Sequence, residues 1–286
     1  MTENTMPQVL TQDIGDAGLQ YLLYECDGPT LILMHATGFQ PWLWHPIARA
    51  LSGKWRIVAP YFCDHRVSDP QEGGLHWMQV AEDLKIFCER LGIRTPGLVG
   101  HSMGATVLTL AHAAFGLEAT GMVLVEPIFL PQDFYRAHVT VDMHPLAAKS
   151  IKRRDHWTTR EEALAYLRSR PLFGKWDDEM LSLYLDHGFR PGDEGGLSLA
   201  CSPMREASLF MGAVHYDPWP LLPKVSCPVL ILEGGESENR PFIDLRKAAS
   251  LMPGGEYGLV EGAGHLIPME QPGLVARTIG EFFAAR

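Results

Sequence analysis

The chain has 286 residues, of which 46% are hydrophobic and 20% are charged, so it is long and apolar enough to bury a large core. Its formal charge of −10 argues against nucleic acid or an anionic membrane surface as the main partner. The first residues lack the basic start and apolar centre of a signal peptide, and no apolar run reaches the roughly 18 residues of a membrane span, which together predict a cytoplasmic protein.

Short apolar runs predict the strands of one sheet. The first two, residues 21–24 and 30–34, flank the turn Cys26-Asp27-Gly28-Pro29 and are expected to form a hairpin. Four further strand-like runs follow at 55–59, 97–99, 122–125 and 229–232. Helical patterns separate them at 46–51, 76–91, after 102, and at 273–284. Because these strand-like runs are continuously apolar and alternate with helices, we expect the α/β class, with a doubly wound, mostly parallel sheet.

The alternation of strands and helices stops between residues 127 and 216. Helical patterns at 160–169 and 177–187 predict an all-helical insertion in this stretch, with residues 1–126 and 217–286 forming the main domain. The insertion contributes several large apolar side chains, namely Trp157, Phe173, Trp176, Tyr184, Met204, Phe210 and Met211. These side chains either line a substrate cavity or form the core of the insertion itself.

The pentapeptide Gly100-His101-Ser102-Met103-Gly104 carries the strongest chemical signal. It follows a strand-like run and opens a helical pattern, so it predicts a sharp turn with a serine at its apex. A turn this tight crowds the backbone, and glycine fits there because it has no Cβ. The arrangement projects the Ser102 hydroxyl away from the sheet at a helix N-terminus, where negative charge is stabilised. Ser102 is therefore the candidate nucleophile.

A serine needs a base to take its proton, and His265 is the candidate among the twelve histidines. It ends the sequence Gly262-Ala263-Gly264-His265, directly after the strand-like residues 257–260. The oxyanion formed by attack on a carbonyl also needs positioned N–H donors. We expect these from the backbone of Met103, which follows the nucleophile, and of Thr37, in a loop that Gly38 allows to turn.

The order of these motifs resembles the α/β-hydrolase superfamily over nearly the whole chain. It is most similar to lipase- and esterase-like serine hydrolases that carry the loop sequence HATGF, here residues 35–39, and a Glu-Pro pair, here Glu126-Pro127. The resemblance implies that the insertion is a helical cap, or lid. Two departures affect the mouth of the pocket: Ala36 replaces a usual glycine, and the segment 61–68 keeps only His65 and Ser68 of the usual D-x-R-G-H-G-x-S pattern.

The acid that completes the triad has two candidates. The resemblance implies either the end of the strand 122–125, where Glu126 follows at once, or the loop after the strand 229–232. In that loop the slot usually filled by aspartate holds Ser237, and Glu238 comes one residue late. A carboxylate at a buried strand end is unstable without a partner. We therefore favour Glu126 and keep Glu238 as the alternative.

These residues predict a serine hydrolase that cleaves carboxylic esters of small to medium hydrophobic acids through an acyl-enzyme. We expect no cofactor and no metal. The five cysteines are scattered without a C-x-x-C pair, which speaks against a disulfide framework or a zinc site. A serine nucleophile speaks against the haloalkane dehalogenases and epoxide hydrolases, which use aspartate. The same triad suits a thioesterase, a C–C bond hydrolase or a cofactor-free haloperoxidase, and a non-enzymatic ligand receptor is the alternative from another class. The sequence does not predict the oligomeric state.

Overall fold

The computed structural model describes residues 6–193 and 195–286, built around an eight-stranded sheet with strand order β1-β2-β4-β3-β5-β6-β10-β11. The strands are β1 Gln8–Asp13, β2 Gly18–Tyr24, β3 Thr30–Met34, β4 Arg56–Pro60, β5 Gly97–His101, β6 Gly121–Val125, β10 Val229–Gly234 and β11 Gly255–Val260. From β4 across to β11 all neighbours are parallel, whereas β1 and β2 join antiparallel. The expected doubly wound, mostly parallel sheet is confirmed.

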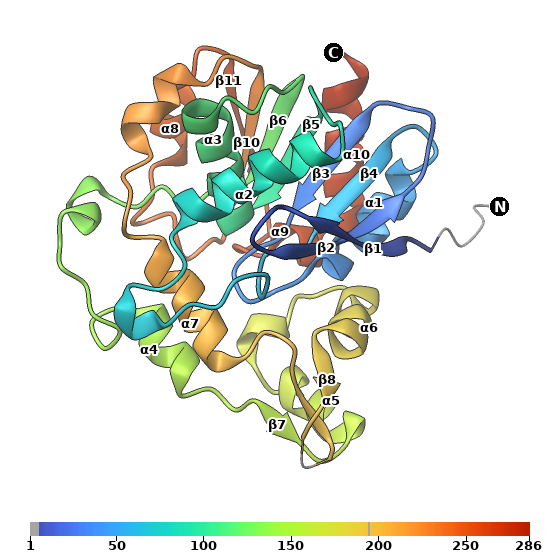
Figure 1. The fold of residues 1–286 in the computed structure, drawn as a ribbon, viewed down its shortest axis with the longest axis vertical. Helices are drawn as coiled ribbons and strands as arrows, with labels where there is room; N and C mark the ends of the chain where they lie inside the picture. Colours follow the sequence, from blue (N-terminus) through green and yellow to red (C-terminus); the bar gives the residue numbers. More distant parts are fainter. Residues whose placement is uncertain (1–5, 194) are drawn as a thin grey trace.

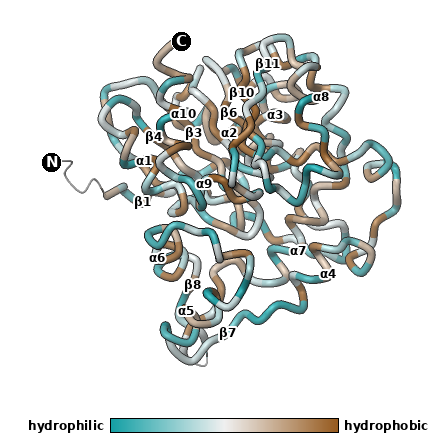
Figure 2. Tube along the Cα trace, turned by 180° about the vertical axis from the view of Figure 1, so that it is seen from behind, coloured by the Kyte–Doolittle hydropathy of each residue, from teal (hydrophilic) through white to brown (hydrophobic). Residues whose placement is uncertain are grey.

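Helices cover both faces of this sheet, and the core therefore has two layers (Figure 1). One layer contains α2 Trp77–Arg90, α3 Met103–Phe115 and α8 Leu245–Leu251, and the other contains α1 His45–Leu51 and α10 Pro272–Ala284. Along β3, Ile32 and Met34 pack into the first layer while Leu31 and Leu33 pack into the second, as alternation along a strand requires. Figure 2 shows the resulting hydrophobic band along the strands. Both faces are buried, which explains the continuously apolar runs.

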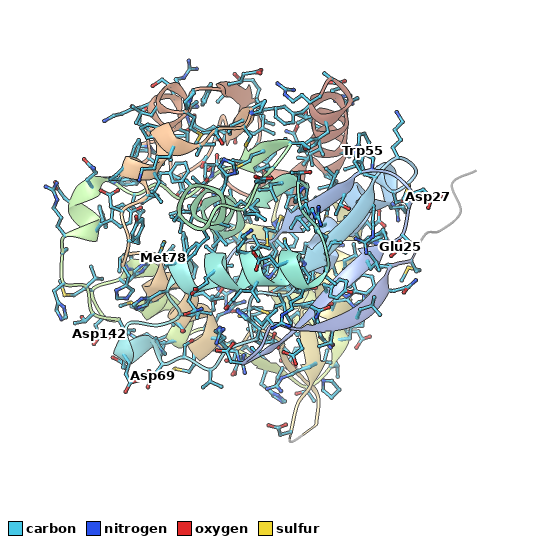
Figure 3. The ribbon with its side chains drawn as sticks, turned by 45° about the horizontal axis from the view of Figure 1, so that its top comes forward. Glu25, Asp27, Trp55, Asp69, Met78 and Asp142 are labelled. Carbon is cyan, nitrogen blue, oxygen red and sulfur yellow. The ribbon has the colours of Figure 1, made fainter. Side chains whose placement is uncertain are left out.

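The prediction of a hairpin around residues 26–29 is wrong. β2 pairs with β1 and β4, and β4 lies between β2 and β3 in the sheet. The connecting loop passes over the start of β4, where a Cβ on Gly28 would lie 1.9 Å from the carbonyl oxygen of Lys54. Figure 3 labels Glu25 and Asp27 on this loop with Trp55 near them. The edge hairpin is instead β1–β2, which the sequence reading missed.

Between β6 and β10 the chain leaves the main sheet and forms a separate body beside it (Figure 1). Its helices are α4 Pro145–Ile151, α5 Arg160–Arg168, α6 Asp178–His187 and α7 Pro203–Gly212. It also holds a small sheet of β7 His156–Trp157, β8 Phe189–Pro191 and β9 Leu197–Leu199. The expectation of an all-helical insertion is therefore wrong. The chain reverses after Pro191, and β8 therefore pairs antiparallel with β9. The residues Pro191-Gly192, which are typical of turns, indicate this reversal in the sequence.

Short helical turns complete the chain: the 3-10 helices η1 Pro41–Trp44, η2 Pro70–Glu72, η3 Gln132–Tyr135, η4 Pro171–Phe173 and η5 Trp219–Lys224, and the α-helix α9 Ile267–Glu270. Among the described helices, none combines the length and the apolar character that crossing a bilayer requires.

The large side chains of the insertion mostly pack on one another. Phe173, Trp176 and Tyr184 are buried, with ring centroids 4.9 Å apart for Phe173 and Trp176 and 5.7 Å apart for Trp176 and Tyr184. Trp157 and Met211 are buried as well, while Met204 is exposed. Of the two roles considered for these residues, forming the insertion's own core is the one their burial supports. The same buried hydrophobic cluster continues into the main domain, for example through the contacts of Phe39 with Trp176 and Tyr184.

Candidate active site

Ser102 lies in the tight turn between β5 and α3. Its backbone has φ 54° and ψ −116°, a conformation that is rare for a residue with a side chain. The flanking positions must be glycine because neighbouring backbone atoms leave no room for a Cβ. A Cβ on Gly100 would lie 2.5 Å from the amide nitrogen of Ala105, and one on Gly104 would lie 2.4 Å from the carbonyl oxygen of Met34. The sharp turn predicted from the pentapeptide is therefore present, with the serine at its apex.

Ser102, His265 and Glu126 form a continuous hydrogen-bonded chain although they are far apart in the sequence. The Nε2 atom of His265 lies 3.1 Å from the Oγ atom of Ser102, and its Nδ1 atom lies 2.9 Å from the Oε2 atom of Glu126. A carboxylate can only accept, so Nδ1 carries the proton and Nε2 is left as an acceptor. This tautomer allows His265 to take a proton from the Ser102 hydroxyl.

Glu126 follows β6 directly and is only 1% exposed. Its Oε1 atom accepts the N–H of Gly234 at 2.6 Å, and its Oε2 atom accepts the hydroxyl of Ser237 at 2.8 Å. Together with the His265 ring, these donors stabilise a carboxylate that is removed from water. Glu238 is exposed and forms no hydrogen bond or ion pair within the described parts of the chain. The structure thus brings Glu126, and not Glu238, to His265.

Ser237 and Asn239 support the His265–Glu126 pair, and the sequence reading did not assign them a role. The side-chain amide of Asn239 lies 3.0 Å from the Nδ1 atom of His265, and its backbone N–H donates to the Oγ atom of Ser237 at 3.3 Å. The atom placed there is the amide nitrogen Nδ2, which cannot donate to a protonated Nδ1. The side-chain amide is therefore assigned the opposite orientation, in which its oxygen faces the ring as a second acceptor. The sequence feature that could have indicated this role is Ser237 itself, because it occupies the position where related enzymes often place the acid of the triad.

His101, the residue before Ser102, holds the loop of His265. Its Nε2–H donates to the backbone carbonyl of His265 at 2.9 Å. Burial, followed by the nearby His265 ring, lowers the pKa of His101 well below its ordinary value, so the ring is uncharged at neutral pH. His101 therefore holds the loop of His265 with an uncharged ring.

Thr37 lies in the loop after β3, and Gly104 of the Ser102 turn approaches the backbone of Met34 and His35, where this loop begins. The Nδ1–H of His35 donates to the carbonyl of Ala36 at 2.8 Å, and its Nε2 atom accepts the N–H of Phe62 at 2.9 Å. Burial lowers the pKa of His35 to about 4, so the ring stays neutral and fixes the loop. Among the described residues, no acceptor bonds the backbone N–H of Thr37 or of Met103. Both groups remain available to an oxyanion.

The segment that departs from the usual family pattern, residues 61–68, is anchored by Asp83 of α2. The Nε2 atom of His65 lies 2.8 Å from one oxygen of Asp83, and Arg66 donates to both oxygens at 2.6 and 2.7 Å. The hydroxyl of Ser68 bonds that of Ser208 on α7. This segment therefore joins the main domain to the insertion.

Comparison with known proteins gives a consistent picture. The sequence pattern described as the Alpha/beta hydrolase family matches residues 31–278. The chain is 25% identical to a 2-(acetamidomethylene)succinate hydrolase from Mesorhizobium japonicum over 90% of this chain and 89% of that one. It is 26% identical to Carboxylesterase YbfK from Bacillus subtilis over 90% of this chain and 80% of that one. A crystal structure of E-2-(acetamidomethylene)succinate hydrolase superimposes with a TM-score of 0.81 at 22% identity, covering 97% of this chain and 99% of the other.

Proposed function

The chain belongs to the Alpha/beta hydrolase family, and on that premise we propose that it is a serine hydrolase cleaving carboxylic esters of small to medium hydrophobic acids. The observation that carries the proposal is the chain of contacts Ser102 to His265 at 3.1 Å and His265 to Glu126 at 2.9 Å. A buried carboxylate that fixes the histidine tautomer is the arrangement that activates a serine. A ligand receptor on the same scaffold would not need it.

In the proposed reaction, the Oγ atom of Ser102 attacks the ester carbonyl while the Nε2 atom of His265 takes its proton. Glu126 stabilises the imidazolium ion that forms. The backbone N–H groups of Met103 and Thr37 stabilise the oxyanion. His265 then gives its proton to the departing alcohol, and water activated by the same ring releases the acid from Ser102.

Substitution of the nucleophile tests this proposal. For Ser102→Ala we expect hydrolysis of p-nitrophenyl butyrate to fall by at least ~10⁴-fold, because the covalent route is removed. Ser250→Ala, which changes a serine on the surface helix α8, serves as the matched control and should keep wild-type activity. A fluorophosphonate probe should label the wild-type protein at Ser102. Near-normal hydrolysis by Ser102→Ala, or no labelling of the wild type, would contradict the proposal.

We further propose that residues 127–216 act as a cap and that residues 1–126 and 217–286 form the catalytic domain. The contact of Phe39, in the loop that carries Thr37, with Trp176 and Tyr184 indicates that the insertion turns apolar side chains toward this loop, which supports a hydrophobic substrate. A panel of p-nitrophenyl esters of increasing acyl length tests the preference. An enzyme that accepted only short charged acids would refute the hydrophobic substrate.

A second candidate is the hydrolysis of a small polar acid derivative. It is favoured by the similarity to 2-(acetamidomethylene)succinate hydrolase, which extends over 90% of this chain and 89% of that relative. The same panel should therefore include 2-(acetamidomethylene)succinate and an acyl thioester. Turnover of either compound well above that of every oxygen ester would replace the ester assignment.

A further inference from the structure

A cavity of about 160 Å³ lies between the main domain and the insertion. Gly38 and Gln40, in the loop that carries Thr37, line one side, and Gly188 and Cys201 of the insertion line another. The cavity therefore begins one residue from a proposed oxyanion donor.

The side-chain amide of Gln40 has a fixed orientation in this cavity. Its Oε1 atom accepts the backbone N–H of Trp42 at 3.1 Å and so caps the helix η1. An N–H group can only donate, so the amide atom that faces Trp42 must be the oxygen, and the Nε2 atom is assigned by chemistry. Gln40 is 3% exposed, which prevents the amide from turning out to bulk water.

The Nε2 atom of Gln40 is buried and has no hydrogen-bond partner within the described residues. Leaving a buried donor unpaired costs about 1–3 kcal/mol, so this position calls for an acceptor from outside the chain. The thiols of Cys63 and Cys201, which line the same cavity, are only weak acceptors. An oxygen atom would be the suitable acceptor for the Nε2–H group of Gln40.

Among the residues that line the cavity, the charges favour a neutral oxygen over a carboxylate. Arg205, whose positive charge acts on Cys63, lies outside this lining. His187 stacks on Trp42 with ring centroids 3.8 Å apart, and burial lowers its pKa, so it provides no positive charge at neutral pH. Asp64 lines the cavity with an exposed carboxylate that would repel an anion. The Gln40 amide is itself uncharged and cannot compensate a buried negative charge.

In the proposed reaction, the acyl part of the ester lies on the side of the Thr37 loop. The departing alcohol must lie at the Nε2 atom of His265, which protonates it, whereas the acyl carbonyl oxygen lies at the Thr37 loop. The acyl chain is bonded to the same carbon as that oxygen, and Gln40 follows Thr37 by three residues in the same loop.

We propose that Gln40 forms a specificity site that donates a hydrogen bond to a neutral carbonyl oxygen within the acyl chain, so that oxo- or amido-acyl esters are the preferred substrate class. The inference rests on the proposed serine hydrolase function. Gln40 touches the bound substrate in this scheme but takes no part in the proton transfers.

A pair of esters of nearly equal shape tests the proposal. In p-nitrophenyl levulinate the acyl chain carries a ketone, and in p-nitrophenyl isocaproate a methyl branch takes the place of that oxygen. We expect the wild type to prefer levulinate in kcat/KM by about 10-fold or more, since an unpaired buried donor is left with isocaproate. N-acetylglycyl p-nitrophenyl ester, which carries an amide carbonyl at the same position, should share the preference.

Two variants separate the proposed donor role of Gln40 from its role in capping the helix η1. Gln40→Met removes both functions, while Gln40→Glu keeps an oxygen for the N–H of Trp42 but loses the donor. In both variants the ratio of kcat/KM for levulinate to that for isocaproate should fall about 10-fold, and a ratio within one protein is insensitive to a general loss of activity. Gln71→Met, at an exposed glutamine outside the cavity lining, should keep the wild-type ratio.

The outcomes distinguish the two proposals. If the wild type hydrolyses both esters and is labelled at Ser102, but its ratio equals that of Gln40→Met and Gln40→Glu, the hydrolase assignment stands and the Gln40 site is refuted. If the wild type neither hydrolyses the esters nor reacts with a fluorophosphonate, the hydrolase assignment itself fails.

Discussion

Backbone strain within the described residues is confined to two side-chain-bearing positions. Ser102 has φ 54° and Glu126 has φ 51°, and every other residue described with positive φ is a glycine. The two lie at the ends of the neighbouring parallel strands β5 and β6. Such conformations cost of order 1–3 kcal/mol each and persist where the surroundings impose them. Their coincidence with two members of the proposed triad indicates that the strain serves to aim these side chains.

The acid can be identified by a matched pair of substitutions. Glu126→Gln keeps the size of the side chain but removes the charge that stabilises the imidazolium ion, and we expect kcat to fall by about 10³–10⁴-fold. Glu238→Gln changes the exposed alternative and should leave kcat within about 3-fold of the wild type, in line with other surface substitutions. The measurement is steady-state hydrolysis of p-nitrophenyl butyrate. The reverse pattern would transfer the role to Glu238.

At the scale of elements, the nucleophile turn depends on how closely α3 approaches β3. A Cβ on Gly104 would meet the carbonyl oxygens of Met34 and His35 at 2.4 and 2.7 Å, and neither backbone group can move without shifting the sheet. Gly104 therefore determines how closely α3 packs on β3 as well as the geometry of the proposed nucleophile turn.

We expect Gly104→Ala to lower the free energy of unfolding by more than about 2 kcal/mol, because the overpacked backbone must shift. Gly53→Ala is the control, since a Cβ there meets nothing within 4 Å and its φ is not positive. Urea unfolding monitored by circular dichroism measures both variants. Equal stability of Gly104→Ala and the wild type would show that the close approach is not rigid.

A second link between elements, Asp83 of α2 with the segment after β4, makes stability depend on pH. Burial alone would raise the pKa of Asp83, but hydrogen bonds from Arg66, His65 and Gln79 outweigh it and lower the pKa to about 2. Because the folded-state pKa is below the unfolded value near 3.8, the carboxylate stabilises the fold above about pH 4, and this contribution disappears as the pH falls toward 2.

The expected size of this contribution is about 2 kcal/mol, the free-energy equivalent of the shift from 3.8 to about 2. Unfolding free energies measured between about pH 6 and pH 3 should show a steeper acid loss in the wild type than in Asp83→Asn, which lacks the titrating group. Parallel pH profiles for the two proteins would contradict the assignment.

At the scale of the whole molecule, the insertion is attached to the main domain by polar contacts as well as by packing. Arg49 of α1 forms a two-pronged ion pair with Glu179 of α6, with contacts of 2.7 and 2.9 Å. The backbone N–H of Asp177 donates to the carbonyl of Met269 at 2.9 Å. These contacts fix one side of the proposed cap near α9.

Breaking the ion pair should loosen this side of the insertion more than it destabilises the fold. We expect Arg49→Gln to lower the unfolding free energy by about 1 kcal/mol or less, since the pair is partly exposed, and to speed hydrogen exchange in α6. Lys85→Gln breaks a pair with Glu89 that lies within α2 and should leave exchange in α6 unchanged. Unchanged exchange in both variants would show that packing alone holds the insertion.

Much of this protein follows from its sequence alone, because the signals are local. Continuously apolar runs require strands that are covered on both faces, and they gave the sheet and its class. The glycines around Ser102 and the loop of His265 indicated the proposed nucleophile and base, since a tight turn and a histidine after a strand can be recognised from adjacent residues alone. The insertion was also visible, as a break in the alternation of strands and helices.

Only the tertiary structure decided what depends on residues distant in the sequence. Strand order placed β4 between β2 and β3, which excluded the expected hairpin. The neighbouring ends of β5, β6 and β10 brought Glu126 to His265, with Ser237 beside it, and left Glu238 in solvent. Hydrogen bonds and burial are properties of spatial neighbours, so the choice between two glutamates and the unpaired amide of Gln40 could be read only from the folded chain.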